Sequence, residues 1–118
     1  NLWSTPPAHG AAVVATILAD TELNNLWVSE LDAMRQRVAS LRGGLIEALQ
    51  PYGLSERFAH ISLQRGMFSY TGLSPTQVQR LRDEFSVYMV GSGRANMAGL
   101  DAERLDQLAS AISRVCCD

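Results

Sequence analysis

The 118-residue sequence contains no lysine, and all ten of its basic residues are arginine. Without a lysine amine, the chain cannot form a Schiff base with a carbonyl substrate or cofactor. It also lacks the phosphate-binding lysine of a P-loop, so nucleotide hydrolysis by that route is unsupported. Either kind of chemistry needs residues that this sequence does not supply.

The sequence contains neither a run of like charges nor a long apolar segment. Ten basic and twelve acidic residues are spread along the chain and give a net charge of −2, so we expect no surface that attracts phosphate backbones or anionic lipid. No apolar run approaches the roughly 20 residues that cross a bilayer, and the first residues lack the basic start of a secretory signal. We expect a cytoplasmic protein with neither nucleic acid nor membrane as a partner.

Residues that ligate metals or move protons are few. Cys116 and Cys117 are adjacent and cannot close an ordinary disulfide without strain. His9 and His60 are scattered and complete no evident zinc site, and neither has a visible partner for acid–base work. We expect reduced thiols on a terminal helix turn, no metal site and no catalytic residue.

The apolar content of 47% fits one domain with a single core. Pro6 and Pro7 suit the entry to an apolar helix through GAAVVATILAD. Capping oxygens at Asp20 and Thr21 follow, and apolar residues then recur at intervals of four and three, which predicts one long amphipathic helix from Thr21 to Leu49. The residues of this apolar stripe are Leu23, Trp27, Leu31, Met34, Val38, Leu41, Leu45 and Leu49.

A helical hairpin broken at Gly43 and Gly44 is the alternative, because each glycine costs about 1 kcal/mol in a helix interior. The apolar spacing stays in phase through the pair and favours continuity. Pro51 and Gly53 then end the helix, and the following ten residues predict a loop or a short helix.

The second half of the chain mixes short strands with helices. Alternation in GMFSYTGL predicts a strand over residues 66–73, and Ser74 with Gln77 forms the capping box of a helix. VYMV and ANMA, residues 87–90 and 95–98, read as two strands of a hairpin around GSGR, and Asp101 caps a last helix. The predicted fold is an α/β, two-layer small domain with helices on one face of a small sheet and a long N-terminal bridging helix.

Arg94 is the candidate binding residue. Gly91 and Gly93 remove side-chain bulk around it, so its planar guanidinium can meet a carboxylate through two parallel hydrogen bonds. Phe68, on the strand expected to pair with this hairpin, adds an apolar or aromatic contact. Taken singly, such an arginine is more often a solvated surface residue and such a phenylalanine more often core.

These segments together resemble the C-terminal part of the class I aspartate and aromatic amino acid aminotransferases. The resemblance rests on NLWSTPPAHGAAVVATIL, ELDAMRQRV, QRGMFSYTGL, SPTQVQRLRDEF and VYMVGSGRANMAGL, which occur in the family's order and cover essentially the whole chain. It implies that Arg94 grips the substrate α-carboxylate and that Phe68 lies near the substrate pocket. It also implies that Trp3 and Ser4 lie near the subunit interface and the neighbouring active site.

The resemblance further implies a homodimeric parent enzyme that uses pyridoxal phosphate to move an amino group between an amino acid and a 2-oxo acid. Residues 1–20 would belong to the large domain or linker, and residues 21–118 would be the small domain. Lacking the Schiff-base lysine, this chain alone is expected to bind no cofactor and to be inactive. A freestanding carboxylate-binding module and a dimerisation module built on the long helix are the alternatives.

Overall fold

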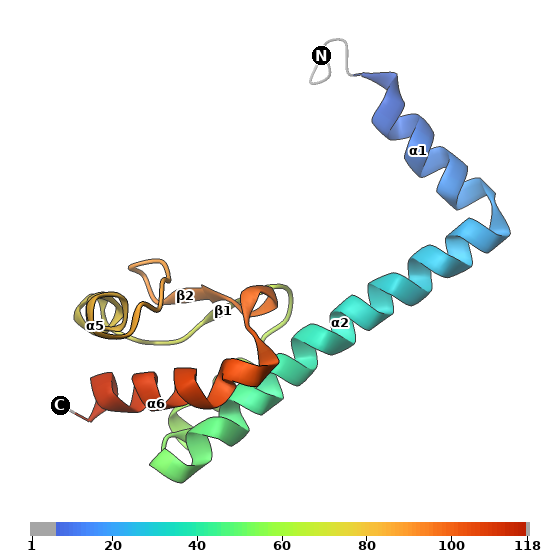
Figure 1. Cartoon of the computed structure of the whole chain (residues 1–118). Coiled ribbons are helices and arrows are strands. Elements are labelled where there is room, and N and C mark those ends of the chain that lie inside the picture. The colour runs from blue at the N-terminus through green and yellow to red at the C-terminus, as the bar shows by residue number, and fades with distance from the viewer. Residues whose placement is uncertain (1–6, 118) are drawn as a thin grey trace. The chain divides into compact units, whose positions relative to one another are not determined.

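A computed structural model describes residues 7–117 of the chain. These residues divide into two compact units, one ending at Met34 and the other beginning at Arg35. Figure 1 shows their ribbon and labels the longer helices and both strands. Among the described residues, no helix combines the length and the apolar character needed to cross a bilayer.

The first unit consists of α1, Ala8–Ala19, and the first part of α2, Thr21–Leu49. The predicted cap between them is present, because Asp20 Oδ1 accepts hydrogen bonds of 2.9 Å from the backbone N–H groups of Glu22 and Leu23. No described residue of this unit is buried. Its exposed large apolar side chains are Val13, Val14, Leu18, Leu23, Leu26, Trp27, Val28, Leu31 and Met34.

Helix α2 is continuous from Thr21 to Leu49, so the predicted long helix is confirmed and the hairpin broken at the glycine pair is wrong. Only its second half is buried, at Leu41, Arg42, Leu45 and Leu49. A 3₁₀ turn, η1 (Gln50–Tyr52), follows and ends at Gly53, whose φ of 69° is the left-handed conformation that glycine adopts without strain. Two short helices come next, α3 (Ser55–Phe58) and α4 (His60–Leu63).

The capping box predicted for the next helix is confirmed. Helix α5 spans Pro75–Phe85, and Ser74 and Gln77 exchange hydrogen bonds between side chain and backbone at 2.9 and 3.2 Å. Asp101 also caps as expected, but it caps a 3₁₀ turn, η3 (Ala102–Arg104), and α6 (Leu105–Cys116) starts only after it. The first-turn N–H groups therefore have side-chain partners at both places.

The sheet has two antiparallel strands, β1 (Phe68–Tyr70) and β2 (Arg94–Asn96), and β2 runs into the 3₁₀ turn η2 (Met97–Gly99). Phe68 pairs with Asn96 and Tyr70 with Arg94. The predicted strand over residues 87–90 is wrong, because this segment forms no strand and β2 pairs with β1 instead. The expected pairing between the Phe68 strand and the Arg94 segment is confirmed.

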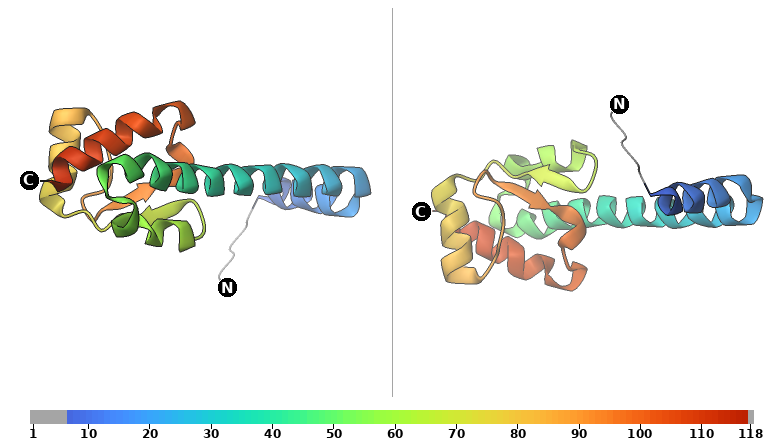
Figure 2. Two further views of the ribbon diagram at one scale, coloured as in Figure 1. Left: turned by 90° about the horizontal axis from the view of Figure 1, so that it is seen from below. Right: turned by 90° about the horizontal axis from the view of Figure 1, so that it is seen from above.

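Helices cover one face of this sheet. Within the second unit, α6 and the end of α2 lie beneath the strands in Figure 1, and the two views of Figure 2 agree. The core lies between these layers and is formed by Leu45, Leu49, Phe58, Ile61, Leu73, Val78, Leu81, Met97, Ala109, Ala111, Ile112 and Val115. The predicted small α/β domain with helices on one sheet face is thus confirmed.

Candidate functional site

The register of the two strands decides which side chains face the helices. Side chains alternate along a strand, and the paired residues Ser69 and Ala95 take the covered face: Ser69 is 2% exposed and Ala95 contacts the core. The opposite face therefore carries Phe68, Tyr70, Arg94 and Asn96, all of which are exposed. Two residues of this outer face are those selected from the sequence.

Arg94 and Phe68 are diagonal neighbours on the outer face, as the register requires. The Cζ atom of Arg94 lies 4.8 Å from the centroid of the Phe68 ring, within the range of a cation–π contact. Phe68 is 45% exposed, which excludes its being a core residue. The sheet thus presents a cation beside an aromatic ring on one open face.

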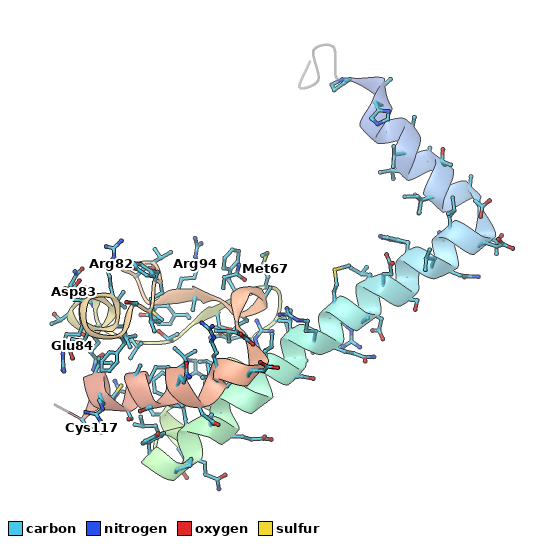
Figure 3. The ribbon with its side chains drawn as sticks, viewed as in Figure 1. Met67, Arg82, Asp83, Glu84, Arg94 and Cys117 are labelled. Carbon is cyan, nitrogen blue, oxygen red and sulfur yellow. The ribbon has the colours of Figure 1, made fainter. Side chains whose placement is uncertain are left out.

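The Arg94 side chain points away from the helical layer, as Figure 3 shows. Among residues 7–117, no carboxylate forms an ion pair with Arg94 and no acceptor takes a hydrogen bond from its side chain. Its N–H groups are therefore available for an external acceptor. Because a guanidinium donates two parallel hydrogen bonds in a fixed plane, a carboxylate matches it best.

The turn before Arg94 is fixed by backbone hydrogen bonds. Gly93 N–H donates to the carbonyl of Val90 at 2.8 Å, and Gly93 O accepts from both Thr71 N–H at 2.9 Å and Thr71 Oγ1 at 2.8 Å. Gly93 has φ 80°, a conformation that other residues rarely adopt. Arg94 thus extends from a rigid support, which limits the entropy lost when it binds a ligand.

An open hollow of about 280 Å³ adjoins the two residues. Its lining residues are Phe68, Tyr88, Met89, Val90, Arg94 and Asn96. The sequence analysis selected two of them and missed the others. Three of the missed residues, Tyr88, Met89 and Val90, belong to the VYMV run, whose positions alternate between half-buried and exposed. The sequence analysis assigned this run to a strand. The hollow therefore combines one cation with mainly apolar walls.

The remaining candidate residues lie away from this hollow or outside residues 7–117. Trp3 and Ser4 lie outside the described residues. Cys116 and Cys117 are free thiols, and burial raises the pKa of Cys116, with the Arg57 charge opposing that effect and Cys117 adding to it. Within residues 7–117, no group of three His, Cys, Asp or Glu side chains is placed to hold a metal ion.

The sequence and the fold of the chain match one class of protein. Residues 1–112 match the family described as aminotransferase class I and II, so the chain belongs to this family. The resemblance found in the sequence is therefore confirmed. Among curated relatives, the aromatic-amino-acid aminotransferase of Pseudomonas aeruginosa is 71% identical over 118 residues, which are all of this chain and 30% of that protein.

Solved structures give the same result. The aromatic-amino-acid aminotransferase of Burkholderia pseudomallei, covalently bound to pyridoxal phosphate, superposes with a TM-score of 0.90 at 49% identity, over 96% of this chain and 28% of that one. The aromatic amino acid aminotransferase of Psychrobacter sp. B6, crystallised with aspartic acid, gives 0.91 at 40% identity, over 98% and 29%. This chain therefore spans less than a third of the length of these relatives.

The family's cofactor, pyridoxal phosphate, does not fit this chain as a covalent ligand. No lysine occurs in its 118 residues, so no side chain here can form the Schiff base that anchors the cofactor. The outer face of the sheet offers one arginine and apolar walls. These groups suit the carboxylate and side chain of an amino acid.

Proposed function

We propose that this chain is the substrate-recognition part of a pyridoxal phosphate-dependent aromatic or aspartate aminotransferase, which moves an amino group between an amino acid and a 2-oxo acid. The observation that carries the proposal is the Arg94 guanidinium, unpaired among the described residues and held 4.8 Å from the Phe68 ring beside an open hollow. The ligand of the Psychrobacter relative, aspartic acid, carries the carboxylate that such a group binds.

In this proposal Arg94 binds the substrate α-carboxylate through its two parallel N–H groups. Phe68 and the apolar wall of the hollow contact the rest of the substrate and exclude water from the ion pair, which strengthens it. Holding one end of the substrate in this way fixes the direction of its α-hydrogen. The chain contributes orientation to the reaction, and the lysine that anchors the cofactor comes from residues outside this sequence.

The domain arrangement is part of the proposal. Residues 1–20 belong to the large domain or the linker, residues 21–118 form the small domain, and the enzyme is a homodimer with Trp3 and Ser4 near the subunit interface. The many exposed apolar side chains of the first unit support this arrangement, because exposed apolar surface often marks a site that further protein covers. Further protein covering α1 would account for these side chains.

The test uses a chimera, defined as the Pseudomonas aeruginosa aromatic-amino-acid aminotransferase with its matching 118-residue segment replaced by this chain. We expect the chimera to transaminate aromatic amino acids, and the isolated chain to show neither cofactor absorbance nor turnover. Arg94→Lys in the chimera keeps the positive charge but loses the planar pair of N–H donors. It should raise the KM for the amino acid about tenfold or more, because a hydrogen bond to a charged group contributes about 1.5–3 kcal/mol.

Arg114→Lys is the matched control, since Arg114 is an exposed arginine of α6, in the helical layer. It should leave the KM unchanged. If the two lysine variants behave alike, Arg94 does not bind the substrate. Turnover by the isolated chain would contradict the statement that catalysis needs residues outside this sequence.

A further inference from the structure

A second arginine, Arg42 of α2, is buried behind the candidate site. It is 5% exposed, yet its partners are all neutral oxygens of β1 and the loop before it. Its Nε donates to Ser69 Oγ at 3.1 Å, and its Nη2 donates to the carbonyls of Gly66 at 2.6 Å and Phe68 at 3.1 Å. One side chain thus holds two residues of the strand that carries Phe68 and one residue of the loop before it.

Packing alone does not explain a cation at this position. Arg42 adjoins the apolar stripe of α2, between Leu41 and Leu45, where an aliphatic side chain would fill the space without the desolvation penalty of a charge. Three hydrogen bonds offset part of that penalty. Their common effect is to fix β1 and the loop that leads into it, because every acceptor lies on Gly66, Phe68 or Ser69.

Arg37 lies about one and a half turns earlier on α2 and binds the segment that follows β2. Its Nη1 donates to Ala98 O at 3.0 Å and its Nη2 to Leu100 O at 3.2 Å. Ala98 belongs to η2, which directly follows β2, and Leu100 is the residue after η2. The same helix therefore binds backbone carbonyls of β1 and of the segment that follows β2.

We infer that Arg42, assisted by Arg37, is a positioning residue for carboxylate recognition: it fixes β1 so that the Phe68 ring stays against the Arg94 guanidinium. The inference rests on the proposed function of Arg94. The link is direct, because the residue whose ring lies 4.8 Å from Arg94 is the residue whose carbonyl Arg42 binds. The side chain of the next residue, Ser69, faces the helices, and its Oγ accepts from the same guanidinium, so rotation of the strand about its axis is also restricted.

The physical consequence concerns the charge on the ligand. With β1 loosened, the ring no longer holds the guanidinium or shields it from water, so the pair formed with a carboxylate weakens. An uncharged analogue that relies only on the apolar wall is affected much less. The ratio of the two affinities therefore reports on positioning, and it does not depend on how much of the enzyme is folded.

The experiment measures inhibition of the chimera by 3-phenylpropionate and by its uncharged amide, 3-phenylpropionamide. Arg42→Met keeps a similar length without charge or donors, and it should raise the Ki of the acid about tenfold while changing the Ki of the amide less than about twofold. Ser69→Ala removes one acceptor and is a milder variant that should raise the acid Ki about two- to fivefold. Arg37→Met should give a Ki for the acid between those of these variants and that of the unsubstituted chimera, because Arg37 binds only the segment that follows β2.

Arg42→Lys and Arg94→Lys separate the possible outcomes. Lysine lacks the planar fork, so Arg42→Lys should restore little of the acid affinity. If Arg94→Lys lowers the acid-to-amide preference while Arg42→Met and Ser69→Ala leave it at the chimera's value, the positioning role is refuted and the proposed function stands. If Arg94→Lys also leaves the preference unchanged, the proposed function itself fails. Should Arg42→Met not fold, Ser69→Ala decides the question.

Discussion

Gly93 is the residue whose replacement should most directly disturb the support of Arg94. Its φ of 80° is unfavourable for any residue with a side chain. A Cβ at this position would lie 2.9 Å from the carbonyl oxygen of Leu73 and 3.3 Å from Thr71 Oγ1. The nearer atom belongs to the backbone, so the turn has to move to relieve the contact.

The magnitude of the Gly93→Ala effect follows from two contributions. A left-handed conformation costs an L-residue about 1–2 kcal/mol. Moving the turn also weakens the two hydrogen bonds that Thr71 donates to Gly93 O, each contributing about 1 kcal/mol. We therefore expect Gly93→Ala to lower the free energy of unfolding by about 2–4 kcal/mol.

Gly91→Ala is the matched control in the same turn. A Cβ on Gly91 meets no atom within 4 Å, and Gly91 is not among the glycines with positive φ. Its replacement should change the free energy of unfolding by no more than about 0.5 kcal/mol, or should stabilise slightly by restricting the unfolded chain.

The assay is equilibrium urea unfolding of both variants and the parent chain, followed by circular dichroism. With a slope of roughly 2 kcal/mol per molar urea, the midpoint of Gly93→Ala should fall by about 1–2 M and that of Gly91→Ala by less than about 0.3 M. Equal midpoints for the two alanine variants, at unchanged slope, would refute the reasoning. Gly93→Ala should also raise the KM of the chimera for the amino acid, because Arg94 directly follows the displaced residue.

Three further outcomes are expected. Gly43→Ala should raise the free energy of unfolding by about 1 kcal/mol in urea unfolding, because its added Cβ meets nothing within 4 Å in the middle of α2; a loss of stability would contradict this. Ser74→Ala should cost about 1 kcal/mol by the same assay, since it removes the cap on Gln77 N–H, and no change would show the cap to be dispensable. Iodoacetamide at pH 8 should alkylate Cys117 faster than Cys116, because burial raises the pKa of Cys116; mass spectrometry of single Cys→Ser variants measures both rates, and faster reaction at Cys116 would contradict the assignment.

The helices were predictable because their signals are local. The stripe of apolar residues through Gly43 and Gly44 stays in phase, and α2 is continuous there. The capping box at Ser74 depends on residues three apart, and the structure contains both of its hydrogen bonds. In each case the interacting groups are near neighbours in sequence, so no knowledge of the fold was needed.

The strand over residues 87–90 failed for a different reason. Val87 and Met89 are half-buried while Tyr88 and Val90 are exposed, so the period-two pattern correctly reports which side chains face the core. A ladder also needs a partner, and β1 is already paired with β2. Val90 takes part in two hydrogen bonds of the turn, but residues 87–90 form no strand ladder. Hydrophobic alternation records burial, and it does not identify the hydrogen-bonding partner.

The outward orientation of Phe68 could likewise not be predicted from the type of residue. An aromatic residue on a strand favours the core, but in β1 the small polar Ser69 takes the inner face because Arg42 of α2 donates to it there. The partner lies 27 residues away in sequence. The orientation of the site therefore depends on a long-range polar contact that no local pattern contains.

The position of Arg94 follows from what lies beneath the sheet. A two-stranded sheet is marginal by itself in water, and β1 and β2 contribute only three residues each. Their geometry must therefore come from the contacts beneath and beside them. Arg42 binds the Phe68 carbonyl of β1, Arg37 binds Ala98 O just after β2, and Met97 is buried in the core. If that is so, substitutions on the inner face of α2 should alter ligand discrimination without touching the ligand, whereas substitutions on its solvent side should not. Recognition by the outer face would then be a property of the helix behind it as much as of the arginine itself.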